Sequence, residues 1–306
     1  MSSLAIRHGS NQSCASSPSY GDDHGPLAIA HRGGAGLGPE NTLDLFARST
    51  ALGFRYLETD VRVTRDGVAV AFHDESLLRV TGRDALVRDT DWDVVRRLRV
   101  LGTGSRVERI EDVLACFPDA LFSVDVKEPS VVGPLSAAIR RTASAHRVCV
   151  AGGWDRWLAA VRELTSRELR TALGWRALAT LTACARAGVR PPRLGGQFVH
   201  LPPKFAGMPL LRQRVIELAH AQGLKVVVWT IDEPAQMVRL LDRGIDGLIT
   251  DRPDVLREVL LARGTWRPMS RAVPITIGPR PAPVGGLDRG GDICVQDYRC
   301  RMSPHE

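Results

Sequence analysis

The stretch that decides the fold spans residues 27–74 and reads LAIAHRGGAGLGPENTLDLFARSTALGFRYLETDVRVTRDGVAVAFHD. Its apolar spacing predicts a strand at residues 27–30, a helix at 41–52 and two further strands at 54–63 and 68–72. Only the turn sequence TRDG joins the last two strands, and this connection is too short for a crossover helix. We therefore expect a local hairpin there.

The rest of the chain alternates strand-like apolar runs with helical patterns. The strand-like runs lie at residues 121–126, 148–151, 169–173, 197–201, 226–230 and 247–250. The helical patterns lie at about residues 92–98, 110–117, 133–145, 154–165, 175–187, 208–222, 233–243 and 253–263. Alternation on this scale predicts an α/β fold, and the length favours a TIM-type (β/α)8 barrel. Of the nine strand candidates one is surplus to such a barrel, either 68–72 or 197–201.

The predicted barrel accounts for the central part of the chain only. Residues 1–25 are rich in Ser, Gly, Asn and Asp without periodicity, which predicts a disordered arm. The barrel domain spans residues 26–263 and carries a polar, irregular insertion at 75–109, directly after the sequence His-Asp. Residues 264–306 contain Pro, Gly and Arg without an apolar period and predict a disordered tail.

Composition narrows the class of protein. With 44% hydrophobic and 25% charged residues, 306 residues suffice for one substantial core. No apolar run indicates a transmembrane helix or a secretory signal, and the six cysteines form no C-x-x-C pair, so we expect reduced thiols in the cytoplasm. The net charge of +7 suits an anionic substrate or peripheral contact with an anionic membrane, whereas no base-stacking motif favours nucleic acid. The sequence carries no signal for the oligomeric state.

Charged side chains two residues apart on predicted strands point to a cation site. Side chains at this spacing share a face, so Glu58 and Asp60 project together near the carboxyl end of their strand. A cation would relieve the repulsion between them, and oxygen ligands suit Mg²⁺, Ca²⁺ or Mn²⁺. Asp125 is a candidate third ligand, and Lys127 a candidate contact for a phosphate oxygen. The competing interpretations are a solvated strand edge for Glu58 and Asp60 and a structural salt bridge for Asp125 and Lys127.

Two histidines directly follow predicted strands, where a barrel places catalytic groups. His31 is followed by Arg32, and His73 by Asp74. Two histidines can divide acid–base work, one removing a proton and the other protonating a leaving alkoxide. The guanidinium of Arg32 offers a planar fork for a phosphate. We therefore predict His31 and His73 as an acid–base pair beside a phosphate contact.

The glycine-rich loop has a competing interpretation as a dinucleotide fingerprint. Gly34, Gly36 and Gly38 follow a predicted strand and precede a helix, and an acid, Glu58, follows about twenty residues later. The spacing is G-x-G-x-G rather than G-x-G-x-x-G, and a dinucleotide site would leave the two histidines without a role. We therefore do not predict a dinucleotide cofactor.

Taken together, these segments resemble one known enzyme family. HRGGAGLGPENT, LETDVRVTRDGVAVAFHD, VDVK, VVVWTID and GIDGLITDRPDVL are similar to the glycerophosphodiester phosphodiesterases, over about residues 27–260. The resemblance implies a barrel of the phosphatidylinositol-specific phospholipase C type. It implies hydrolysis of glycerophosphodiesters to an alcohol and glycerol 3-phosphate, with Ca²⁺, Mg²⁺ or Mn²⁺ as cofactor. The residue roles that it implies are catalysis by His31 and His73, metal ligation by Glu58, Asp60 and Asp125, and substrate binding by Arg32, Lys127, Glu40, Asn41 and Trp229.

The chain departs from the family pattern at two places. Asp125 stands where the family usually has Glu, and its side chain is one methylene shorter. The family's Ser-Phe after the fifth strand is replaced by the sequence GGWD at residues 152–155. The first departure bears on how the metal is held, and the second on the choice of substrate.

Two alternatives remain open at this point. The first is a lysophospholipase D, in which Trp154, Trp157, Phe205 and Met208 would form an apolar rim for a lipid; the same residues fit a helix core equally well. The second is a barrel that binds phosphate without catalysis. The complete histidine pair and the carboxylates argue for an enzyme.

Overall fold

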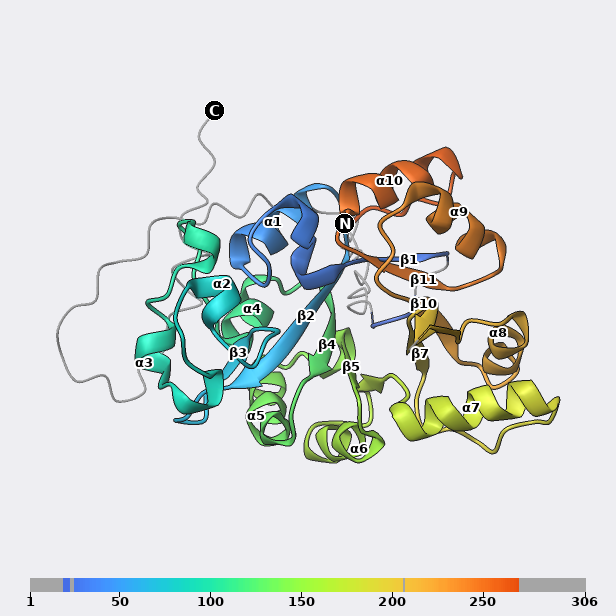
Figure 1. Ribbon diagram of the computed structural model, residues 1–306, viewed down its shortest axis with the longest axis horizontal. Coiled ribbons are helices and arrows are strands. Elements are labelled where there is room, and N and C mark those ends of the chain that lie inside the picture. Colours follow the sequence, from blue (N-terminus) through green and yellow to red (C-terminus); the bar gives the residue numbers. More distant parts are fainter. Residues whose placement is uncertain (1–18, 23–24, 206, 270–306) are drawn as a thin grey trace, which may run out of the picture.

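A computed structural model describes residues 19–22, 25–205 and 207–269, and within them eight parallel strands form a barrel (Figure 1). The order of the strands around it is β6-β5-β4-β2-β1-β11-β10-β7. Their bounds are β1 Leu27–Ala30, β2 Tyr56–Val63, β4 Leu121–Val126, β5 Val148–Gly152, β6 Arg170–Thr171, β7 Phe198–Leu201, β10 Lys225–Val228 and β11 Gly247–Thr250. A bridge between Ala172 and Phe198 joins the two ends of this order. The predicted (β/α)8 fold is therefore confirmed.

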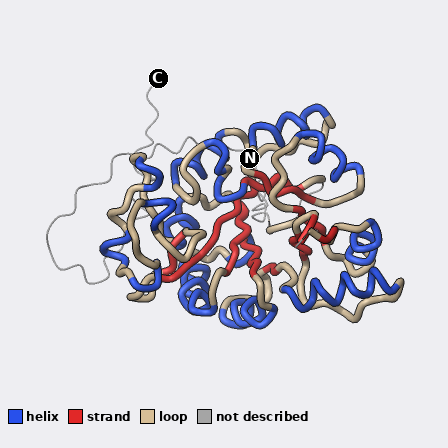
Figure 2. The backbone as a smooth tube through the Cα atoms, viewed as in Figure 1, coloured by secondary structure: helices blue, strands red, loops and turns tan. Residues whose placement is uncertain are grey.

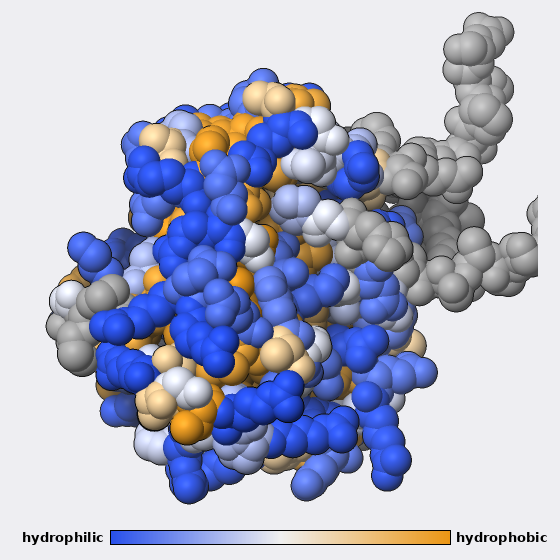
Figure 3. All heavy atoms as spheres, turned by 90° about the vertical axis from the view of Figure 1, so that its right-hand side faces the viewer, coloured by the Kyte–Doolittle hydropathy of each residue, from blue (hydrophilic) through white to orange (hydrophobic). Residues whose placement is uncertain are grey.

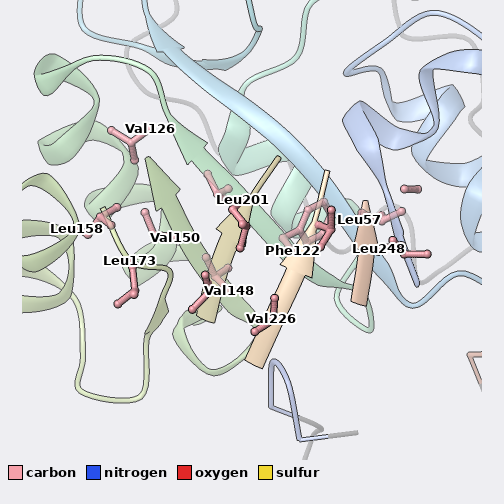
Figure 4. Close-up of a cluster of buried hydrophobic side chains, with 14 of the residues drawn as sticks. Leu57, Phe122, Val126, Val148, Val150, Leu158, Leu173, Leu201, Val226 and Leu248 are labelled. Carbon is pink, nitrogen blue, oxygen red and sulfur yellow. The ribbon is translucent and has the colours of Figure 1, made fainter. Parts of the chain in front are cut away.

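Helices cover the outside of the strands (Figure 2). The helices that follow barrel strands are α1 Leu43–Ala51, α4 Ile110–Cys116, α5 Val132–Arg141, α6 Asp155–Leu164, α7 Trp175–Ala187, α8 Gln213–His220, α9 Pro234–Asp242 and α10 Pro253–Ala262. Apolar side chains on alternate strand positions point outward and pack against them; Leu57, Phe122 and Val226 are fully buried in this layer (Figure 4). The other strand positions point into the barrel, and at its carboxyl end they carry polar side chains.

The structure shows which of the nine strand candidates is surplus to the barrel. β3, Ala69–Ala71, pairs antiparallel with β2 and lies off the barrel, whereas 197–201 supplies the barrel strand β7. The insertion after β3 contains α2 Leu78–Thr81, α3 Trp92–Val95 and two 3-10 turns, Val87–Asp89 and Val100–Gly102. Val70, Phe72 and buried side chains of the insertion form a small apolar cluster of their own. The insertion is therefore packed against the hairpin.

The segment before β1 closes the amino end of the barrel. Tyr20 is 1% exposed, and its ring packs edge-on against Tyr56 and Phe198, with ring centroids 5.1 Å apart in both cases. A Cβ at Gly21 would lie 2.4 Å from the Phe198 ring, so the backbone passes over the barrel where only glycine fits. The predicted arm of residues 1–25 thus contains a segment that belongs to the core; residues 1–18 lie outside the described residues.

Two further boundaries differ from the predictions. The helix expected at 208–222 begins only at Gln213, because the chain first forms the hairpin of β8, Lys204–Phe205, and β9, Met208–Pro209. At the other end, Trp266 packs against Phe54 with ring centroids 5.2 Å apart, so the chain beyond residue 263 continues along the barrel. Residues 270–306 of the predicted tail lie outside the described residues.

The surface is largely hydrophilic where it is seen over α7, α8 and α9, with small apolar patches (Figure 3). Among the described residues, no helix has the length and apolar character needed to cross a membrane.

We predict that Tyr20→Ala lowers the free energy of unfolding by about 3 kcal/mol, because it removes a large aromatic side chain from a closed core. Urea denaturation monitored by circular dichroism measures the change. Tyr20→Phe keeps the ring and serves as the control. An alanine variant as stable as the wild type would show that the segment around Tyr20 does not close the barrel.

Candidate active site

His31 is held by a carboxylate from the last strand of the barrel. Nδ1 of His31 lies 2.7 Å from Oδ1 of Asp251, and Nε2 lies 3.9 Å from Oε2 of Glu58. The contact with Asp251 exists because β1 pairs with β11, with Ala30 beside Thr250. Burial lowers the pKa of His31, but the hydrogen bond to Asp251 and the charge of Glu58 outweigh it, and the pKa lies above its usual value. His31 is therefore disposed to carry a proton.

His73 also has a carboxylate partner, but its pKa shifts in the opposite direction to that of His31. Nδ1 of His73 lies 2.7 Å from Oδ1 of Asp74, the next residue along the chain. Arg79 donates to Asp74 and holds the pKa of that carboxyl well below its usual range, so Asp74 is ionised and accepts from the imidazole. Burial nevertheless lowers the pKa of His73. The second histidine is therefore disposed to be neutral.

The two carboxylates of β2 lie side by side and differ in charge balance. Glu58 is 5% exposed; burial, and then the charge of Asp60, raise its pKa to about 7. Burial also opposes ionisation of Asp60, but Lys127, His73 and Arg32 lower its pKa. The Glu58 carboxylate is thus short of positive charge, although its Oε2 accepts a 2.8 Å hydrogen bond from the Arg32 backbone N–H.

Lys127 joins β2 to β4. Its Nζ lies 2.8 Å from Oδ1 of Asp60 and 2.5 Å from Oδ2 of Asp125. The two carboxylates meet because Asp60 and Asp125 are partners in the register of these strands. Burial lowers the pKa of Lys127, but Asp125 and Asp60 outweigh it and raise the pKa. The ammonium is therefore charged and bridges two of the predicted metal ligands.

The predicted metal ligands fit a hard cation in chemistry, but the arrangement shown is an ion-pair cluster. Glu58, Asp60 and Asp125 offer oxygen donors at the carboxyl ends of two adjacent strands, and the raised pKa of Glu58 marks a deficit of positive charge. Within the described residues, however, no group of three or more histidine, cysteine, aspartate or glutamate side chains is placed to hold a metal ion. The structure ties Asp60 and Asp125 to Lys127, whereas Glu58 contacts His31 and the backbone N–H of Arg32.

The loop after β1 presents Arg32, Glu40 and Asn41 to these carboxylates. Nη1 of Arg32 donates to Oε1 of Glu40 (3.0 Å), and its Nε lies 3.4 Å from Oδ2 of Asp60. Asn41 donates from Nδ2 to Asp60 (3.2 Å) and accepts from Thr59 Oγ1 (2.8 Å). Arg32 and Asn41 both have positive φ, 49° and 57°, and the Asn41 N–H donates to the Arg32 carbonyl (2.9 Å). The tight turn thus aims three polar side chains at one place.

Trp229 is the predicted site residue that stands apart. It follows β10 at the same end of the barrel and is 36% exposed. In the described part of the chain, its side chain makes no hydrogen bond or ring contact with the other predicted site residues.

Sequence reasoning missed two residues that hold the site together, Arg79 and Asp251. Arg79 donates to both oxygens of Glu40, at 2.8 Å each, and to Asp74 at 2.5 Å and 3.0 Å. It lies in the insertion, where no periodicity pointed to it. Asp251 directly follows the last strand, and its position next to the end of the first strand in a closed barrel is the signal that could have identified it.

Known proteins resemble this chain over most of the barrel. Residues 31–255 match the model of the "Glycerophosphoryl diester phosphodiesterase family". Over 247 residues the chain is 40% identical to "Probable glycerophosphodiester phosphodiesterase 2" of Mycobacterium tuberculosis, covering 79% of this chain and 93% of the relative. It is 24% identical over 268 residues to human "Lysophospholipase D GDPD1", covering 76% and 85%.

Solved structures share the fold. The crystal structure of a protein from Silicibacter pomeroyi DSS-3, described as "Putative glycerophosphoryl diester phosphodiesterase", superposes with a TM-score of 0.67 at 25% identity. The superposition covers 79% of this chain and 95% of that one. An Oleispira antarctica phosphodiesterase in complex with the product sn-glycerol-3-phosphate superposes with a TM-score of 0.62 at 19% identity, covering 77% and 97%.

We predict that Asp251→Asn lowers the pKa of His31, because the variant removes the negative charge that stabilises the imidazolium. NMR titration of the imidazole in the presence of a chelator measures the shift. Asp254→Asn is the matched control, since Asp254 pairs with Arg252 on the same segment. An unchanged His31 pKa in Asp251→Asn would contradict the contact.

Proposed function

Since the chain belongs to the glycerophosphoryl diester phosphodiesterase family, we propose that it hydrolyses glycerophosphodiesters with two histidines as acid and base. The protein is thus a phosphoric diester hydrolase, and its proposed products are an alcohol and glycerol 3-phosphate. The observation that carries the proposal is the pair of strand-end histidines, each on its own carboxylate, beside Lys127 and the carboxylates of β2 and β4.

The opposite pKa shifts support a division of labour between the histidines. Two titratable groups whose environments move their pKa values apart mark the acid and the base. His31, with a raised pKa, is the proposed acid that protonates the leaving alkoxide. His73, with a lowered pKa, is the proposed base that removes a proton from the nucleophile. The nucleophile is water or the substrate's own glycerol hydroxyl, which would give a cyclic phosphate that is then opened.

Arg32 and Lys127 are the proposed phosphate contacts. Both side chains lie against Asp60, so each guanidinium or ammonium group is fixed in position before the substrate binds. Preorganised positive charge stabilises the charge that develops on phosphoryl oxygens in the transition state. The Arg79–Glu40 pair in turn holds Arg32, because Glu40 accepts from both arginines.

Glu58, Asp60 and Asp125 are the proposed ligands of a divalent cation, Ca²⁺, Mg²⁺ or Mn²⁺. When bound, such a cation neutralises charge on the phosphoryl oxygens as a Lewis acid. The burial of Glu58 and Asp60 and the raised pKa of Glu58 support this assignment. The ion pair with Lys127 compensates the charge of Asp125.

We predict that His31→Ala and His73→Ala each lower kcat/KM on glycerophosphocholine by roughly 10²- to 10⁴-fold, which is the usual contribution of a general acid or base. An aryl glycerophosphate, whose phenolate leaves without a proton, separates the two roles. It should restore much of the activity of His31→Ala but not of His73→Ala.

His146→Ala is the control for the histidine variants, because His146 lies in the 3-10 turn that precedes β5, at the amino end of the barrel. Near-normal turnover by either site variant on glycerophosphocholine would refute the acid–base pair. Rescue of His73→Ala rather than His31→Ala would exchange the roles.

We predict that a chelator abolishes turnover and that a divalent cation restores it. Asp125→Asn should weaken binding of the cation at least ~10-fold, as measured by calorimetry, because it removes a charged ligand. Asp125→Glu, the residue more usual in the family, is the matched control and should bind the cation about as well as the wild type. Equal affinity of Asp125→Asn would leave Asp125 a salt-bridge partner only.

We predict that Arg79→Met lowers kcat roughly 10- to 100-fold, because residues that orient catalytic side chains commonly contribute this much. The variant frees both Asp74, which holds His73, and Glu40, which holds Arg32. Arg83→Met, four residues later and exposed, is the control for steady-state kinetics. Full activity of Arg79→Met would show that these carboxylates need no arginine.

A lysophospholipase D activity is the second candidate. The relative named a lysophospholipase D and the exposed aromatic residues at the carboxyl end of the barrel favour it. Release of choline from glycerophosphocholine and from lysophosphatidylcholine separates the two functions.

The cytoplasm is the proposed location. Cys149 and Cys184 are free thiols, as expected in a reducing compartment.

A further inference from the structure

Three loops at the carboxyl end of the barrel expose large aromatic side chains. Trp154 lies in the loop between β5 and α6, Trp175 begins α7 after the loop that follows β6, and Phe205 lies in the hairpin after β7. They are 47%, 42% and 51% exposed. We call these three residues the aromatic rim. Large exposed apolar side chains that gather in one place mark a surface with a partner.

Contacts join the three segments that carry the aromatic rim. The Trp175 N–H donates to the carbonyl of Gly153 (2.9 Å), which precedes Trp154 in the chain. A Cβ at Gly153 would lie 2.8 Å from Nε1 of Trp175, so glycine lets the indole lie directly on the loop that carries Trp154. On its other side, Trp175 packs against Phe205 with ring centroids 5.3 Å apart. The three segments therefore lie side by side at the carboxyl end of the barrel.

Each of the three loops also carries an exposed basic side chain close to its aromatic residue. Arg156 lies 5.3 Å above the Trp154 ring, Arg176 is adjacent to Trp175, and Lys204 is adjacent to Phe205. Throughout residues 19–22, 25–205 and 207–269, none of these three side chains takes part in an ion pair. The carboxylate of Asp155 lies among these loops and accepts from the backbone N–H groups of Gly174 and Arg176, so three exposed cations stand against one carboxylate there.

We infer that the aromatic rim and its three basic side chains form a docking surface for an anionic lipid bilayer. Aromatic rings with a polar edge prefer the boundary between headgroups and acyl chains, and Lys and Arg are attracted by anionic headgroups. A protein partner would need acidic groups opposite each loop, whereas an anionic bilayer offers them everywhere. Docking by this surface turns the carboxyl end of the barrel, with its catalytic groups, toward the headgroups.

This inference goes beyond the proposed function, because binding to a bilayer requires no turnover. It is tested by sedimentation of the full chain with vesicles of phosphatidylcholine mixed with phosphatidylglycerol, and with vesicles of phosphatidylcholine alone. We expect binding to the mixed vesicles that weakens as salt is added. No binding of the wild type to the mixed vesicles would overturn the inference.

The apolar part of the surface is tested by a triple variant, Trp154→Ser, Trp175→Ser and Phe205→Ser. It should bind the mixed vesicles at least ~10-fold more weakly, because three large rings no longer leave water on docking. The matched control replaces Leu164, Val189 and Leu261 by Ser. These residues are 48%, 52% and 43% exposed and lie at the carboxyl ends of α6, α7 and α10, hence at the opposite end of the barrel.

The charged part is tested by Arg156→Gln, Arg176→Gln and Lys204→Gln combined, which should also weaken binding ~10-fold or more and flatten its salt dependence. The matched control changes three exposed arginines at the opposite end of the barrel, Arg186, Arg190 and Arg193, to Gln and should bind as the wild type does. If the aromatic variant melts earlier than the wild type, the charge variant decides alone, since it removes only exposed side chains. Binding that survives both rim variants, or is lost in the control instead, would overturn the inference.

Discussion

One ammonium group, that of Lys127, holds two carboxylates on adjacent parallel strands, and the rest of the site depends on this contact. Asp60 is almost completely buried, and an uncompensated charge at such a position costs several kcal/mol. The register that places Asp60 beside Asp125 also places Glu58 one layer deeper, beside Ser123, and among the described residues Glu58 forms no ion pair with Lys127. The barrel therefore places several carboxylates close together and compensates only part of their negative charge. Such a site favours binding of a cation, alone or together with an anionic ester.

The two histidines depend on this cluster and on two further carboxylates, one from the far end of the chain and one adjacent in sequence. Asp251 can hold His31 only when the last strand has closed against the first. Asp74 holds His73 from within the hairpin, and Arg79 of the insertion ties it to Glu40. Barrel closure and the packing of the insertion thus fix the carboxylates that hold the two histidines, although neither the last strand nor the insertion supplies a histidine.

The mouth of the barrel has two chemically different sides. The carboxyl ends of β1, β2 and β4 and the segment after β3 carry the two histidines, the carboxylates, Arg32 and Lys127. The loops after β5, β6 and β7 carry Trp154, Trp175 and Phe205 in exposed positions. A substrate with a phosphodiester on one side and an apolar or lipid environment on the other would match both. The departure from the family pattern at residues 152–155 falls on the aromatic side, so it bears on what the phosphodiester is attached to rather than on its cleavage.

The sequence by itself determined the fold class, the hairpin after β2 and the shared face of Glu58 and Asp60, because periods of two and 3.6 residues and short turns are local properties of the chain. It did not determine the role of Tyr20, because the polar residues around it give no sign that its side chain is buried. Tyr20 packs in the barrel against Phe198, which lies over a hundred residues later in the sequence. Nor did the sequence identify Asp251 and Arg79, whose contacts with His31 and Glu40 join segments 220 and 39 residues apart. Only the closed barrel decided which carboxylate pairs with which cation. This pairing depends on strand register and on the burial of charged groups, and neither can be read from a single segment of the sequence.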